Sequence, residues 1–218
     1  GGLIFMPHPR TKGSTGYPDV VKDSAQFLDE RYRGVGWRWG MGLDLSETRL
    51  SDGRVLELFD DMNNWAASRP GPLKFIQAIT ETYRKQPGDD IYANNPVSYV
   101  KVDRLPTVDD MNPIINAMKR GDYFWTSGEV LISSYALEGA GAQRTVKADV
   151  EWTFPLDFVE VVWGDGKKTD RQIIPASDLP AFGKKQFQIP FDATGKKWVR
   201  FAAWDVATSA TPRSKRPS

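Results

Sequence analysis

A strict alternation of apolar and polar residues in the C-terminal half constrains the fold of this chain more than any other feature. From Val146 to Phe154 every second residue is apolar. The residues between them are polar or charged: Lys147, Asp149, Glu151 and Thr153. Successive side chains of a β-strand point to opposite faces, so the pattern predicts a strand with one buried and one solvated face. Such strands are typical of antiparallel sheets.

Further strand patterns follow along the chain. The apolar run Val159–Trp163 leads into Gly164-Asp165-Gly166, whose Asp-Gly pair is a strong signal for a β-hairpin. Alternation returns over Phe187–Phe191 and over Trp198–Trp204, and no pattern of helical length separates these runs. We therefore expect residues 123–206 to form a small antiparallel β-sandwich domain.

The tryptophans of this half have two interpretations. Their place in alternating patterns favours burial, because large aromatic side chains mostly contribute to cores. The alternative is a non-enzymatic binding or structural module whose tryptophans contact carbohydrate or a partner protein. The residues concerned are Trp152, Trp163, Trp198 and Trp204.

Residues 1–122 combine short apolar runs with helical periodicity, which predicts an α/β region. Three runs predict strands: Leu3–Met6, Arg54–Phe59 and Val97–Val102. Apolar residues at helical spacing predict helices from Asp19 to Gly34, from Pro72 to Tyr83, and from a Thr107–Asp110 capping box to Gly121. The Gly- and Trp-rich segment Gly34–Gly42 is expected to pack as an ordered loop.

Composition narrows the classes of partner. The chain has 29 Lys and Arg residues against 28 Asp and Glu, a formal net charge of +1, so we expect neither nucleic acid nor a membrane surface as partner. It has no cysteine, which excludes disulfides and thiolate catalysis. We expect a small-molecule substrate, and a disordered basic tail over residues 207–218.

The only histidine follows the first predicted strand, within Pro7-His8-Pro9. In α/β folds, ligands and catalytic groups gather at the carboxyl ends of strands. His8 is therefore a candidate metal ligand, and Arg10 and Lys12 are candidate contacts for an anionic group of the substrate. A single imidazole excludes a zinc or iron centre built on several histidines of this chain, and leaves an oxygen-only magnesium or calcium site as the alternative.

Two carboxylates and two carboxamides directly follow the second predicted strand, in Asp60-Asp61-Met62-Asn63-Asn64. If that strand ends beside His8, Asp60 and Asp61 are further candidate metal ligands, and Asn63 and Asn64 are candidate substrate contacts. Asp and Asn are also favoured in turns and helix caps, so a purely local role is an equal alternative.

Three segments resemble parts of one known family. Gly2–Pro9 is similar to an apolar strand followed by His-Pro, Asn116–Gly128 is similar to a passage of helix, Arg-Gly, strand and Ser/Thr-Gly, and Phe158–Gly166 looks like part of a C-terminal β-domain. All three occur in the polymerase-and-histidinol-phosphatase (PHP) superfamily of metal-dependent phosphoesterases, in its carbaryl-hydrolase-type branch. The resemblance implies the C-terminal part of a distorted seven-stranded β/α barrel, followed by a β-domain.

The resemblance also implies an activity and a metal. It implies hydrolysis of phosphoester, or of carbamate and ester, bonds with a divalent zinc, manganese or iron ion in a longer parent protein. His8 would be one ligand and the family's His-x-His pair would lie upstream, in keeping with a chain that begins Gly1-Gly2-Leu3. Asp90–Pro96 stands where the family has an Asp-x-His motif. The expected metal site is therefore incomplete, and the chain alone is expected to be inactive.

Overall fold

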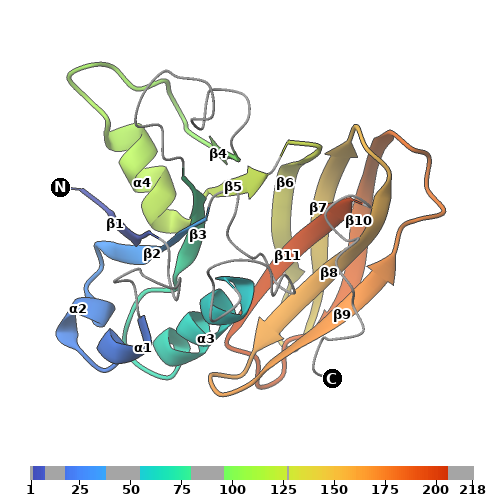
Figure 1. Cartoon of the computed structure of the whole chain (residues 1–218). Helices are drawn as coiled ribbons and strands as arrows, with labels where there is room; N and C mark the ends of the chain where they lie inside the picture. Colours follow the sequence, from blue (N-terminus) through green and yellow to red (C-terminus); the bar gives the residue numbers. More distant parts are fainter. Residues whose placement is uncertain (1, 8–17, 38–54, 80–95, 127, 206–218) are drawn as a thin grey trace. The chain divides into compact units, whose positions relative to one another are not determined.

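The computed structural model describes residues 2–7, 18–37, 55–79, 96–126 and 128–205 (Figure 1). The chain divides into two compact units. The α/β unit comprises Gly1–Met62 and Arg69–Ser127, and the β unit comprises Asn63–Ser68 and Gly128–Ser218. Helix α3, Val55–Ala67, contributes residues to both units.

The α/β unit contains a parallel sheet of three strands. Strands β1 (Ile4–Met6), β2 (Tyr32–Trp37) and β3 (Phe75–Ala78) lie in the order β1-β2-β3, and both pairs are parallel. The short helices α1 (Pro18–Val21) and α2 (Ala25–Leu28) lie between β1 and β2 in the chain, and α3 lies between β2 and β3. This alternation is the connection that parallel strands require.

The expectation of a β/α barrel segment is wrong. The other described strands of this unit, β4 (Val97–Val100) and β5 (Tyr123–Thr126), form a two-stranded antiparallel ladder. The described strands therefore form small separate sheets and no closed barrel, and antiparallel pairs predominate. A barrel needs a continued repeat of parallel strands, each followed by a helix, and the β4–β5 ladder interrupts that repeat.

Where one helix was expected up to Gly34, the chain forms two short helices and then a strand. Ser24 separates the helices, because its Oγ accepts from the Phe27 amide as the N-cap of α2 and donates to the Val21 carbonyl. Strand β2 is buried along its whole length, as a parallel strand covered on both faces must be. Gly34 allows this packing, because a Cβ there would lie 1.8 Å from the carbonyl oxygen of Phe75 on β3.

In two other places the structure has a helix where a strand was expected, or a strand where a helix was expected. The segment expected to be a strand at Arg54–Phe59 is the start of α3, and the helix expected from Pro72 contains β3 in its described part. A short apolar run carries too little periodicity to decide between strand and helix. The helical period becomes clear only when the buried positions Leu56, Phe59, Asn63 and Ala66 are taken together.

The last helix of the α/β unit agrees with the expectation. Helix α4, Asn112–Arg120, ends at Gly121, which has a left-handed φ of 80°, with Lys119 and Arg120 in its last turn. The expected capping box is wrong. Thr107 and Asp110 instead exchange two backbone hydrogen bonds of 3.1 Å, and the N-cap residue is Met111, which has no capping side chain.

The β unit contains two antiparallel sheets of three strands. One has the order β10-β7-β6, from Gly183–Asp192, Gln143–Trp152 and Val130–Gly139. The other has the order β11-β8-β9, from Trp198–Asp205, Leu156–Gly164 and Thr169–Pro175. The predicted strands are confirmed, and so is the hairpin between β8 and β9, where Asp165 Oδ1 accepts from the amides of Lys167 and Lys168 at 2.7 and 2.8 Å.

The two sheets of the β unit share one apolar core. The predicted inward positions of β7 are at most 3 % exposed. Residues of the other sheet pack with them, among them Val159, Val161 and Phe201. This β-rich arrangement is compatible with the expected β-sandwich. Three of the four tryptophans considered above, Trp152, Trp198 and Trp204, are 3, 6 and 7 % exposed, and Trp163 is partly buried against the core.

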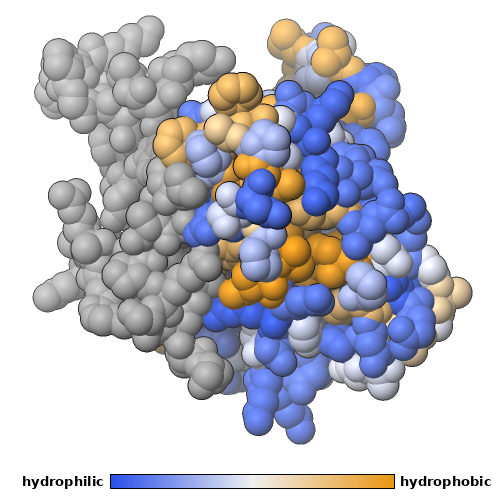
Figure 2. All heavy atoms as spheres, turned by 90° about the vertical axis from the view of Figure 1, so that its right-hand side faces the viewer, coloured by the Kyte–Doolittle hydropathy of each residue, from blue (hydrophilic) through white to orange (hydrophobic). Residues whose placement is uncertain are grey.

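Exposed apolar residues occur on the surface as well. On the side of the molecule shown in Figure 2, hydrophobic residues form a patch among hydrophilic ones. Large exposed apolar residues of the β unit include Phe154, Ile173 and Phe182. Within the described ranges, every helix is too short or too polar to cross a lipid bilayer.

Candidate functional site

The carboxyl edge of the parallel sheet is the first candidate site. Because β1, β2 and β3 are parallel, their last residues Met6, Trp37 and Ala78 lie at the same edge of the sheet. The chain continues from them into residues 8–17, 38–54 and 80–95, which lie outside the described residues. His8, Arg10 and Lys12 belong to the first of these segments. In open α/β sheets this edge is the usual place for ligands.

Aromatic packing holds the strand ends at this edge. Trp37 is 1 % exposed, and its ring lies 4.9 Å from that of Trp125 on β5. The Ile79 amide donates to the Trp37 carbonyl at 2.8 Å, which extends the β2–β3 pairing by one bond. Gly36 leaves room for this contact, because a Cβ there would lie 2.8 Å from the Ile79 side chain. At this edge the end of β2 is thus buried and hydrogen-bonded to the residue that follows β3.

The acidic and amide cluster does not stand at a strand end, contrary to the expectation. Asp60, Asp61, Asn63 and Asn64 all lie within helix α3. Asp60, Asn63 and Asn64 are 7, 3 and 3 % exposed. The alternative role in a turn or cap is wrong too, since none of the four is at a helix end. Among the described residues, no three His, Asp or Glu side chains come together in a way that could hold a metal ion.

Asn64 has a clear structural role in the β unit. Its Oδ1 accepts from Trp198 Nε1 at 3.0 Å and from the Gly166 amide at 3.2 Å, and its Nδ2 donates to Thr169 Oγ1 at 3.0 Å. The carboxamide therefore joins the second half of α3 to the β8–β9 hairpin and to β11. These partners are about a hundred residues away in the chain, and no local pattern indicates them.

Lys74 is a buried cation that the sequence pattern did not reveal. It is 1 % exposed, and its Nζ donates to the carbonyls of Phe27 and Tyr32 while lying 4.5 and 4.8 Å from the centres of their rings. Burial lowers the pKa of Lys74 to about 8. Because it precedes β3 and contacts the start of β2, it lies at the amino end of the sheet. The carboxyl edge is at the other end.

Glu160 is the corresponding buried charge of the β unit. It lies on β8, is 1 % exposed, and its Oε1 accepts from Trp204 Nε1 at 3.2 Å. Two guanidinium groups accompany it, with Arg200 Nη1 at 3.4 Å and Arg171 Nη1 at 3.7 Å from its carboxylate oxygens. The three strands β8, β9 and β11 each contribute one charged group to this cluster.

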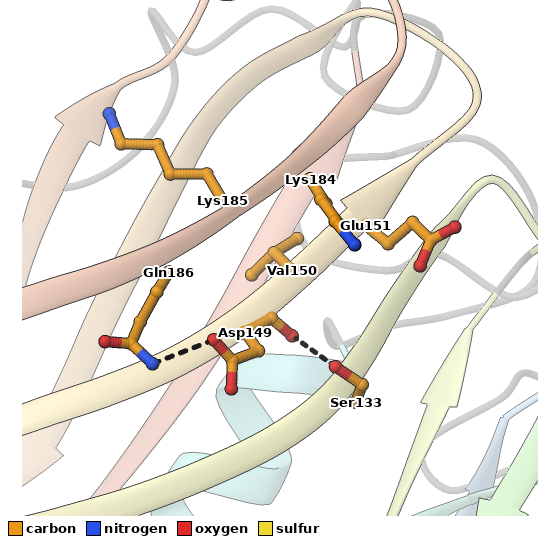
Figure 3. A pocket seen from close by; sticks show the side chains of 7 residues that line it. All are labelled: Ser133, Asp149, Val150, Glu151, Lys184, Lys185 and Gln186. Carbon is orange, nitrogen blue, oxygen red and sulfur yellow. Dashed lines mark hydrogen bonds between the residues drawn. The ribbon is translucent and has the colours of Figure 1, made fainter.

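A polar depression on sheet β10-β7-β6 is the second candidate site (Figure 3). It has a volume of about 440 Å³ and is lined by Ser133, Asp149, Val150, Glu151, Lys184, Lys185 and Gln186. Asp149 is its most constrained group. Ser134 Oγ donates to Asp149 Oδ2, and Gln186 Nε2 donates to Oδ1 at 3.0 Å. These two hydrogen bonds lower the pKa of Asp149 and so favour its charged form, and the bond from Ser134 has the larger effect.

The alternating pattern of β7 predicted which residues would face outward, but it could not show that three strands place them around one depression. That placement depends on the register, which sets Ser134, Asp149 and Gln186 side by side.

Comparison with known proteins adds no relative: no family model matches the chain, and no curated protein or solved structure does so either.

Proposed function

We propose that this chain serves in a metal-dependent hydrolase of the PHP type, which cleaves phosphoester bonds or carbamate and ester bonds. The observation that carries the proposal is the parallel sheet β1-β2-β3, whose first strand ends at Met6, directly before Pro7 and His8. A ligand position at the carboxyl end of a parallel strand is where α/β enzymes place their chemistry. The resemblance of Gly2–Pro9 to the family's His-Pro strand supports the same position.

His8 is the metal ligand in this proposal, and Arg10 and Lys12 bind the anionic part of the substrate. The described residues supply no cluster of three ligands. A zinc, manganese or iron ion there would activate a water molecule and polarise the scissile bond.

Metal binding tests the proposal directly. The chain is loaded separately with zinc, manganese and iron, dialysed, and its metal content measured by mass spectrometry. Because the expected site lacks its upstream ligands, we expect the chain to retain a measurable but incomplete content, below about one ion per chain, of at least one metal. We also expect His8→Ala to lose it, whereas Asp178→Asn, an exposed carboxylate of the β unit, retains it. A wild-type chain that retains no metal, or a His8→Ala variant that binds as well as wild type, contradicts the proposal.

Burial argues against the alternative of a binding module built on tryptophans. Trp152, Trp198 and Trp204 are too buried to present a ring to a carbohydrate or a partner protein. Trp152 Nε1 also donates to the Pro180 carbonyl at 2.9 Å, and Trp198 Nε1 donates to Asn64. Their polar atoms therefore serve the interior of the β unit.

A further inference from the structure

We propose that the depression on the outer face of sheet β10-β7-β6 binds a neutral carbohydrate. This site uses no tryptophan and is independent of the hydrolase proposal. Three observations carry the inference: an unpaired acid and base that face each other across two strands, a preordered carboxylate beside them, and lining residues that are, apart from Val150, polar or charged.

Glu151 and Lys184 are the unpaired acid and base. They are directly opposite in the register of β7 and β10, and both are exposed. Figure 3 shows the two side chains next to each other at one end of the depression. Over the part of the chain that the structure describes, neither forms an ion pair or a side-chain hydrogen bond. On the same face, Lys147 and Glu138 do pair, at 2.6 Å.

The Glu151 carboxylate, a hydrogen-bond acceptor, and the Lys184 ammonium, a donor, can together bind two neighbouring hydroxyl groups. Opposite residues of an antiparallel pair have Cβ atoms about 5 Å apart. A vicinal diol of a sugar can donate one O–H to the Glu151 carboxylate while its other oxygen accepts from the Lys184 ammonium. Hydrogen bonds to charged partners are the stronger kind, so this contact can be effective even in an open site.

Asp149 provides a second fixed acceptor. Gln188 Nε2 donates to Gln186 Oε1 at 2.7 Å, Gln186 donates to Asp149, and Ser134 donates to the other carboxylate oxygen. This chain of bonds orients the carboxylate before any ligand arrives. Each carboxylate oxygen has a second lone pair, so Asp149 can accept further hydroxyl groups without breaking these bonds.

The lining excludes other ligand classes. On the outer face the carboxylates of Asp149 and Glu151 exceed the ammonium of Lys184 by one formal charge, which disfavours anions. Lys185 does not alter this balance, because it is opposite the buried Val150 and its Nζ lies 5.3 Å from the centre of the Phe187 ring. Among the described residues no three His, Asp or Glu side chains gather to hold a metal cation. The only apolar lining residue is Val150, and its side chain is 1 % exposed because it belongs to the core. A volume of about 440 Å³ lies in the range of small-ligand sites.

Titration with defined oligosaccharides tests the proposal. The full chain is titrated by calorimetry with cellohexaose, maltohexaose, mannohexaose and xylohexaose, and in parallel with the zwitterionic peptide tetraglycine. We expect at least one neutral sugar to bind with a Kd of about 1 mM or tighter, and tetraglycine not to bind. Glu151→Gln and Lys184→Met are each expected to weaken the sugar by about tenfold or more.

Lys147→Met is the matched control, because Lys147 lies on the same sheet face but does not line the depression. It is expected to bind sugar as wild type does, and circular dichroism of each variant checks that its fold is unchanged. The proposal is overturned if no sugar binds the wild-type chain, if tetraglycine binds instead, or if the sugar binds Glu151→Gln and Lys184→Met with unchanged affinity.

Discussion

The two units of this chain hold their strands together in different ways. In the α/β unit, β2 is buried along its whole length between β1 and β3, and contacts there leave no room for added atoms. In the β unit, β7 and the second half of β10 bury alternate residues and leave the others at least partly exposed to solvent. The packing of β2 depends on the close approach of the backbones of neighbouring strands and on hydrogen bonds of buried polar groups. The β unit depends instead on side chains packed between its two sheets.

This difference determines where each unit tolerates change. A strand buried on both faces has no position at which an added methyl group is harmless, whereas half the positions of an alternating strand face water. Buried polar groups around this strand donate to main-chain carbonyls: Lys74 Nζ to those of Phe27 and Tyr32, and Arg33 Nη2 to that of Lys119. Substitutions that probe these features separate the two kinds of architecture.

The largest effect is expected for Gly34→Ala. The new Cβ would lie 1.8 Å from the Phe75 carbonyl oxygen, which is backbone and cannot move aside without breaking the β2–β3 pairing. We expect a loss of about 4 kcal/mol in the free energy of unfolding, measured by urea denaturation.

Gly141→Ala in the β unit is the matched control for Gly34→Ala. Gly141 also has a positive φ, 65°, but nothing lies within 4 Å of its Cβ position. The Gly141→Ala variant is expected to lose only about 1 kcal/mol in the free energy of unfolding, because alanine is less stable than glycine in the left-handed conformation. Equal losses for the two variants would show that backbone strain, and not close approach, makes Gly34 necessary.

The same difference explains how much of the fold could be predicted. The alternation from Val146 to Trp152 is a local signal, and it predicted β7, its inward face and its antiparallel character, but not which strands pair with it. Strand β2, by contrast, has the sequence Tyr-Arg-Gly-Val-Gly-Trp, in which two glycines and an arginine hide a fully buried strand. Glycine is needed there for contacts with residues forty positions away, which no window of sequence contains.

The candidate sites divide in the same way. The order of strand and histidine at Met6–His8 could be read directly from the sequence. The cluster at Asp60–Asn64 was assigned to a strand end because its preceding run was too short to show a helical period. The depression around Asp149 was not predicted, because it depends on the register of three strands.

Asn64→Ala is expected to have the next largest effect, a loss of about 3 kcal/mol in the free energy of unfolding measured by urea denaturation. It removes three hydrogen bonds and leaves the buried Trp198 Nε1 without its acceptor. Asn116→Ala is the control, because Asn116 lies in helix α4 and is exposed. That variant should be slightly stabilised by the higher helix propensity of alanine. A similarly small change in Asn64→Ala would mean that the carboxamide network adds little to the β unit.

Lys74 predicts a dependence of stability on pH in the α/β unit. Its pKa is about 8 in the folded chain and 10.5 in the reference state, so between these values the unfolded chain binds more protons. Stability should therefore rise with pH over this window, by up to about 3 kcal/mol relative to the Lys74→Met variant. Tyr32, whose pKa burial raises to about 12, opposes this only above pH 10. Urea denaturation of both proteins at pH 7, 8.5 and 10 measures the difference, and parallel curves would contradict it.

The smallest effect is expected for the surface pair Lys147–Glu138 of the β unit. The two groups are 2.6 Å apart, with 32 and 52 % of their side chains exposed. A double-mutant cycle with Lys147→Ala and Glu138→Ala should give a coupling energy of about 0.5 kcal/mol, which added salt reduces further. A coupling of more than about 2 kcal/mol would mean that the outer face helps to hold the sheet together. A small coupling would mean that the stability of this sheet comes from its inner face, so that the outer residues around Asp149 can serve recognition without cost to the fold.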